Sequence, residues 1–166
     1  MRVNLYNFYI IYLSLEYNSI GSSQNLMPKK PLFEGLVIDE QDRVVEVIYV
    51  GDEPCYVVDD IGFRRHIPAE QVDRQVLESM SEMIEGHEEF LSEQTAKMLG
   101  QEDIFSQAMI SSQLKNIDKQ FENLIQTGIP EDTRTYMGMM GFYIRINVHG
   151  DVVEIEQPGV IDLGEE

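Results

Sequence analysis

Cys55, His66 and either Asp59 or Asp60 are the residues whose types resemble a nucleophile, a base and an orienting carboxylate. Such a triad activates a thiol by proton transfer to the base, and it is recognised by geometry rather than by spacing along the chain. Cys55 begins an apolar stretch, and cysteine is among the residue types most often buried. The sequence therefore favours a core cysteine. We predict no catalytic residues and favour a non-enzymatic protein, while an activity stays open.

Arg64, Arg65 and His66 form the one basic cluster of an acidic chain. A guanidinium offers a planar pair of donors that suits a carboxylate or another anion, so these three residues are candidate contacts for an anion or a ligand. If the segment is a strand, Arg64 and His66 share one face and Arg65 takes the other. Each then has acids nearby for surface ion pairs, which are common and weak. The sequence leaves both interpretations open.

No pattern typical of a metal or cofactor site is found. The three His, at positions 66, 87 and 149, are scattered, and the segment 87–89 lacks the second His that a His-Glu-x-x-His zinc motif requires. The acidic loop 39–42 lacks the Gly and Glu positions of an EF-hand calcium loop. We therefore predict no bound metal and no cofactor.

The charge balance excludes whole classes of function. With 12 Lys+Arg against 30 Asp+Glu, the net charge of −18 repels nucleic acid, so direct binding to phosphates is excluded. One Cys excludes an intramolecular disulfide framework. The length of 166 residues and a hydrophobic content of 43% suit one domain with a real core. Charge this negative would also steer the chain toward a basic protein, so an acidic regulator is one alternative function.

Residues 1–26 differ from the rest, because they carry no net charge and hold four of the eight Tyr. Their apolar run over residues 8–13 is far shorter than the ~20 residues of a membrane-spanning helix. Met27 then begins a short basic lead-in, as in many cytosolic chains. We predict that residues 1–26 are a dispensable tail or an upstream extension of a cytoplasmic protein without a membrane span.

Four short strands are predicted over residues 33–39, 44–50, 55–58 and 63–67, which gives a β-module over residues 27–68. An Asp-containing turn precedes a Val-rich strand, Tyr-Val-Val is followed by a Gly turn, and Ile-Pro-Ala-Glu closes the run. On these features residues 33–70 resemble a PRC-barrel, the small β-barrel of a photosynthetic reaction-centre subunit and a ribosome-maturation factor. The resemblance implies a docking module rather than a catalyst and supplies no functional residues.

Three to four helices are predicted over residues 69–141. The first follows Pro68, carries Glu70 and Asp73 near its positive end and stops at Gly86, and the second runs from Glu88 to Leu99. The third spans 103–127 and the fourth 131–140. The third keeps an apolar period near 3.5 at Ile104, Phe105, Ala108, Ile110, Leu114, Ile117, Phe121, Leu124 and Ile125.

Residues 142–157 alternate as a β-hairpin that packs on the same domain, and residues 158–166 form a loose acidic tail. The predicted fold class is α+β, with an N-terminal β-meander or small barrel, central helices and a C-terminal β-hairpin.

The apolar stripe of the third helix is wider than a short β-module could cover alone. Leu114, Ile117 and Phe121 sit at successive turns of it, so they belong either to the core or to an interface with a second copy. The predicted function is a non-enzymatic, acidic interaction or scaffold module that self-associates or binds a protein partner. The other alternative is a small-ligand-binding protein or enzyme with a pocket near Arg64, Arg65 and His66.

Overall fold

The computed structural model describes residues 2–3, 29–157 and 161–162. Near the chain ends it places two short strands, β1 (Arg2–Val3) and β8 (Ile161–Asp162), which pair antiparallel. The other residues of the predicted tails, 1–26 and 158–166, lie outside the described part apart from these four. The helices and the remaining strands all lie within residues 29–157.

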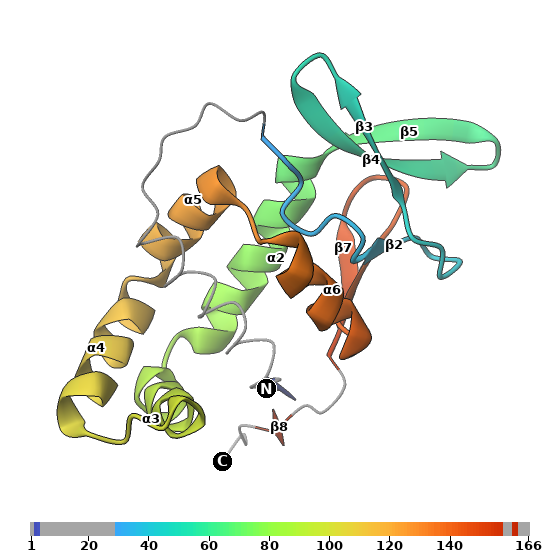
Figure 1. Ribbon diagram of the computed structural model, residues 1–166. Helices are drawn as coiled ribbons and strands as arrows, with labels where there is room; N and C mark the ends of the chain where they lie inside the picture. Colours follow the sequence, from blue (N-terminus) through green and yellow to red (C-terminus); the bar gives the residue numbers. More distant parts are fainter. Residues whose placement is uncertain (1, 4–28, 158–160, 163–166) are drawn as a thin grey trace.

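Two three-stranded sheets stand side by side (Figure 1). One is an antiparallel meander of β3 (Glu46–Val50), β4 (Glu53–Asp60) and β5 (Phe63–Pro68). In the other, β6 (Tyr143–Ile146) pairs antiparallel with β7 (Val152–Glu156) and parallel with β2 (Val37–Ile38). The predicted terminal hairpin is therefore present, and it shares its sheet with a strand from the start of the β-module.

Helices α2 (Ala69–Ile84), α3 (Glu88–Leu99), α4 (Ile104–Lys115), α5 (Ile117–Thr127) and α6 (Glu131–Met139) fill the chain between β5 and β6. The α+β class is thus confirmed, with strands first, helices next and a hairpin last. Within the described ranges, none of these helices has the length and apolar character needed to cross a membrane.

The first predicted strand, over residues 33–39, is wrong in most of its length. Residues 33–36 form a turn in which the Leu36 N–H donates to the Phe33 carbonyl at 2.9 Å, and only Val37–Ile38 is a strand. This strand pairs with β6 and, through the bridge between Ile38 and Val44, also reaches the chain that leads into β3. The pairing of β2 depends on β6, about a hundred residues later in the chain, so the residues around β2 alone do not predict it.

The predicted helix over 103–127 is also wrong, because Asn116 divides it into α4 and α5. The Asn116 side chain donates from Nδ2 to the Ser112 carbonyl at 2.9 Å, and its backbone φ of −109° departs from helical geometry. A side-chain amide that bonds a carbonyl of the preceding turn competes with the helix ladder. The apolar positions keep their three- and four-residue spacing across the break, so the periodicity does not reveal it.

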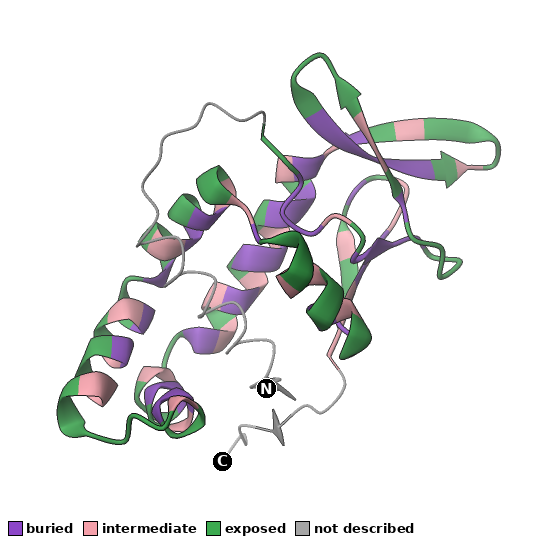
Figure 2. Ribbon diagram, viewed as in Figure 1, coloured by how far each residue is buried: buried purple, intermediate pink, exposed green. Residues whose placement is uncertain are grey.

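The core runs along α2, which packs against β4, β5 and β7 and also against α5 (Figure 2). The apolar spacing predicts a buried stripe on α2, and all of it is buried except Met83, which is half-buried: Val72, Val76, Leu77, Met80, Met83 and Ile84. The rings of Phe33 and Phe142 approach with centroids 6.1 Å apart, which joins the turn before β2 to the start of β6. This packing holds the N-terminal module and the C-terminal hairpin in one core.

Candidate functional site

The basic cluster lies on β5, and each arginine has a carboxylate partner. Arg64 pairs with Glu46 on β3, and Arg65 Nε donates to Asp60 Oδ2 at 2.8 Å. The Arg65 guanidinium also lies 5.8 Å from the centre of the Phe63 ring. His66 is exposed on the strand. The geometry matches the ion-pair interpretation for the two arginines.

Cys55 is buried on β4, where its thiol donates to the Glu53 carbonyl at 3.9 Å, and burial raises its pKa. A raised pKa disfavours the thiolate that a nucleophile needs. In the register of β4 and β5, Cys55 lies opposite Pro68, whereas His66 lies opposite Val57. No group of three or more His, Cys, Asp or Glu in the described ranges has the arrangement of a metal site.

Leu114, Ile117 and Phe121 are buried within the single chain, with exposed fractions of 1%, 7% and 5%. They belong to the same cluster as the apolar residues of α2. Of the two roles that the sequence leaves open, core and subunit interface, this burial assigns them to the core. They have almost no side-chain surface to offer a second copy.

The start of α4 presents apolar side chains to solvent. Ile104 and Phe105 are 82% and 84% exposed, and Met109 is 65% exposed. Ile104, Phe105 and Ala108 belong to the predicted apolar stripe but are exposed. The prediction is wrong for these three residues, because Ile110 and Leu114 occupy the side of α4 that faces the core. Together with Met109 and Ser112, the three residues form what we call the α4 face: Ile104, Phe105, Ala108, Met109 and Ser112.

A polar network lies inside the apolar core. The Asp73 carboxylate accepts from the Leu32 N–H at 2.8 Å through Oδ2 and from the Tyr56 hydroxyl at 2.7 Å through Oδ1. The Tyr56 hydroxyl in turn accepts from the Phe33 N–H at 3.3 Å. Tyr56 is fully buried and Asp73 nearly so. The network therefore ties β4, α2 and the turn before β2 together.

Removal from water dominates the electrostatics of this network. It raises the pKa of Asp73 to about 7, although the hydrogen bonds from Leu32 and Tyr56 act in the opposite direction. The pKa of Tyr56 is raised by the same burial and then by the neighbouring Asp73. The sequence pattern places Asp73 among the acids at the start of a helix and does not predict its burial. One feature of the sequence does indicate this burial: Asp73 lies three and four residues before Val76 and Leu77, so it shares the apolar face of the helix with them.

No family model matches the chain, and neither the curated proteins nor the solved structures include a match. The resemblance of residues 33–70 to a PRC-barrel stays a prediction. Two features of the geometry invite a functional interpretation: the exposed α4 face and the buried Asp73 network.

Proposed function

We propose that this protein is a self-associating interaction module in which two copies meet through the α4 face. The observation that carries this proposal is the exposure of Ile104 and Phe105 on a helix that contains no Asp or Glu. Apolar side chains gathered on one face, without charges among them, are typical of interaction sites. The sequence predicts more apolar residues on this segment than the β-module can cover. The residues of the α4 face are the ones that stay uncovered.

Charge decides which surfaces of two copies can meet. Two chains of −18 repel one another, so they meet at least cost where neither presents a carboxylate. Glu102 and Asp103 precede α4, and Lys115 is its last residue. An antiparallel crossing of two α4 helices would set Lys115 of each copy beside the acids of the other. A two-fold axis produces this arrangement, because it uses the same surface of both copies.

The expected affinity is modest. Burying Ile104, Phe105 and Met109 of both copies contributes on the order of 10 kcal/mol, at ~1.5–3 kcal/mol for each side chain. Association itself costs ~4–15 kcal/mol in lost freedom, so much of this gain is offset. About 5 kcal/mol then remains, which corresponds to a dissociation constant of ~0.2 mM. We therefore expect a weak dimer that strengthens with added salt, because salt screens the repulsion between the two chains.

Sedimentation velocity over a range of concentrations tests the proposal. We expect the wild-type chain to dimerise and Phe105→Asp to remain a folded monomer, with unchanged circular dichroism. Asn123→Asp is the matched control, because it adds one carboxylate at an exposed position of α5 and should leave the dimer intact. A wild-type chain that stays monomeric into the millimolar range would overturn the proposal, as would a Phe105→Asp variant that still dimerises.

A further inference from the structure

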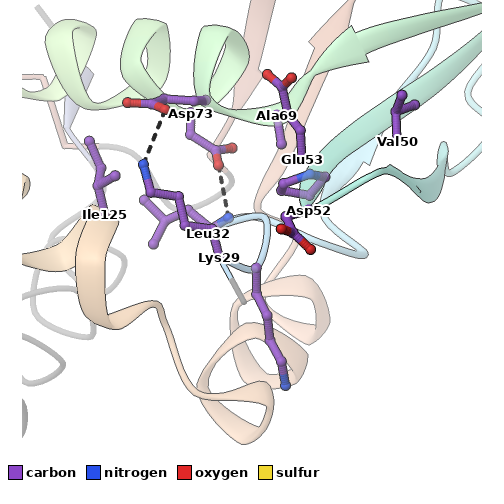
Figure 3. Close-up of a pocket in the computed structure, with 11 residues that line it drawn as sticks. Lys29, Leu32, Val50, Asp52, Glu53, Ala69, Asp73 and Ile125 are labelled. Atoms are coloured by element: carbon purple, nitrogen blue, oxygen red, sulfur yellow. Dashed lines mark hydrogen bonds and ion pairs between the residues drawn. The ribbon is translucent and has the colours of Figure 1, made fainter. Parts of the chain in front are cut away.

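A cavity of about 410 Å³ opens beside the Asp73 network (Figure 3). Its apolar walls come from four parts of the chain that only the fold brings together: Leu32, Val50 and Pro54, Ala69, and Ile125. In Figure 3, Asp73 lies directly across from Leu32, with Ile125 on one side and Asp52 and Glu53 on the other. Volumes of this order accommodate small organic molecules, and apolar walls with a few polar groups are typical of such sites.

The polar lining of this cavity is predominantly negative. Four carboxylates, from Asp52, Glu53, Glu70 and Asp73, face two lysines, Lys29 and Lys30, so the lining has a net charge of −2 when all are ionised. Lys29 Nζ is engaged by Glu70 at 3.5 Å.

Asp52 and Glu53, in contrast, form no ion pair within the part of the chain that the structure describes. The mouth of the cavity thus keeps two carboxylates that are not neutralised, and such a mouth raises the local concentration of cations.

We propose that this cavity binds a small organic cation, a primary amine with a short apolar body, whose ammonium group is held by Asp73. Each carboxylate oxygen of Asp73 accepts one hydrogen bond from the protein and has a further lone pair, while an ammonium group brings three donors. The apolar body packs against Leu32 and Ile125. An anionic ligand would be repelled by the same carboxylates. This site goes beyond the self-association proposed above and does not depend on it.

Tyr56 and Leu32 act as positioning residues in this arrangement. Their hydrogen bonds hold the Asp73 carboxylate in one orientation before a ligand arrives, which lowers the cost of ordering it on binding. Charge-assisted hydrogen bonds in a desolvated place are stronger than those at a surface, so Asp73 should contribute more than Asp52 or Glu53.

Three probes of nearly equal size separate charge from hydrophobic contact: hexylamine, 1-hexanol and hexanoate. Each is titrated into the full chain by calorimetry and by amide NMR spectra. We expect saturable binding of hexylamine, with shifts at the amides of Leu32 and Phe33, and at least tenfold weaker binding of the alcohol and the acid. Equal binding of all three probes, or no saturable binding of the amine, would overturn the proposal.

Variants then assign the ammonium contact. Asp73→Asn should weaken hexylamine binding at least tenfold, while Asp132→Asn, which removes an exposed carboxylate from α6, should leave it unchanged. If Asp73→Asn does not fold, Val50→Trp serves instead, because Val50 is 57% exposed at the mouth and a larger side chain there would fill the cavity without disturbing the core. A folded variant of either kind that binds hexylamine like the wild type would refute the site. Sedimentation of the same samples shows whether self-association stands independently.

Discussion

Replacing Asp73 with Asn should change how stability depends on pH. Burial raises the pKa of Asp73 from the ordinary 3.8 to about 7 in the folded chain. Between these values the folded state binds a proton that the unfolded state releases, so this group stabilises the fold fully below pH 3.8. That contribution is lost as the pH rises through 7. Asn cannot titrate, and it retains an oxygen that can accept from the Leu32 N–H.

The size of the effect follows from the two pKa values. A difference of one pKa unit corresponds to ~1.4 kcal/mol, so the whole contribution of Asp73 is about 4 kcal/mol. Between pH 5 and pH 8 the share that is lost is ~2–3 kcal/mol. The wild-type free energy of unfolding, minus that of Asp73→Asn, should fall by this amount over the same interval.

Other charged groups face Asp73, and comparing the two chains removes most of their influence. The groups around it come from several elements: Tyr56 and Glu53 on β4, Glu70 on α2, Lys29 and Lys30 before the β2 turn, and Asp52 between β3 and β4. They are present in both chains, as is the general repulsion of an acidic protein. In the difference between the two free energies of unfolding, these groups contribute only through their interaction with the charge of Asp73.

Urea denaturation followed by circular dichroism at several pH values between 5 and 8 measures this difference. Asp132→Asn, on an exposed position of α6, is the matched control for the loss of one carboxylate. If the difference between wild type and Asp73→Asn rises with pH, the hydrogen bonds from Leu32 and Tyr56 outweigh desolvation and Asp73 is held ionised. A difference independent of pH would show that Asp73 is reached by water in both states.

Four further outcomes are expected from denaturant and thermal unfolding. Leu114→Ala should cost ~2–5 kcal/mol because the side chain is buried, whereas Phe105→Ala should change the stability of the monomer by less than about 0.5 kcal/mol; equal costs would contradict the assignment of core and surface. Ile61→Asn should stabilise the chain by ~1 kcal/mol, because Ile61 has a φ of 51° and Asn before Gly suits this turn better; a loss of stability would count against strain there. Gly150→Ala should cost ~1–3 kcal/mol, since its φ is +80° and an added Cβ would lie 2.5 Å from Ile67 Cγ2; an unchanged melting temperature would contradict this. Added sodium chloride should raise the melting temperature by screening repulsion within the chain, and a steady fall would mean that specific ion pairs outweigh it.

Elements with strong local signals were predictable from the sequence. Helix α3 runs from Glu88 to Leu99 as predicted, because Gly100 takes the left-handed conformation, with φ 69°, that ends a helix. The alternation of Phe142, Ile144 and Ile146 likewise predicts β6, and all three side chains are buried. Capping residues, turns and hydrophobic period act over a few residues, so one chain segment suffices to recognise them.

The sites were less predictable, because their residues come from separate segments. Asp73 meets Tyr56 and Leu32 only after α2 packs against β4 and the turn before β2. The residues near position 73 do not predict these hydrogen-bond partners. The sequence also left open which apolar residues of the segment 103–127 would be covered. The structure buried Leu114 and left Phe105 exposed, since α4 is apolar on more than one side and only its packing partners choose between them.

The α+β order of elements, the acidic character and the apolar surplus of the long helical segment follow from the amino-acid sequence without further information. The parallel pairing of β2 with β6 and the burial of a carboxylate in the core emerge only when the chain is folded. These two groups of features differ in the range of the forces behind them. Local preferences fix the conformation of a segment, but strand pairing and desolvation depend on what that segment packs against.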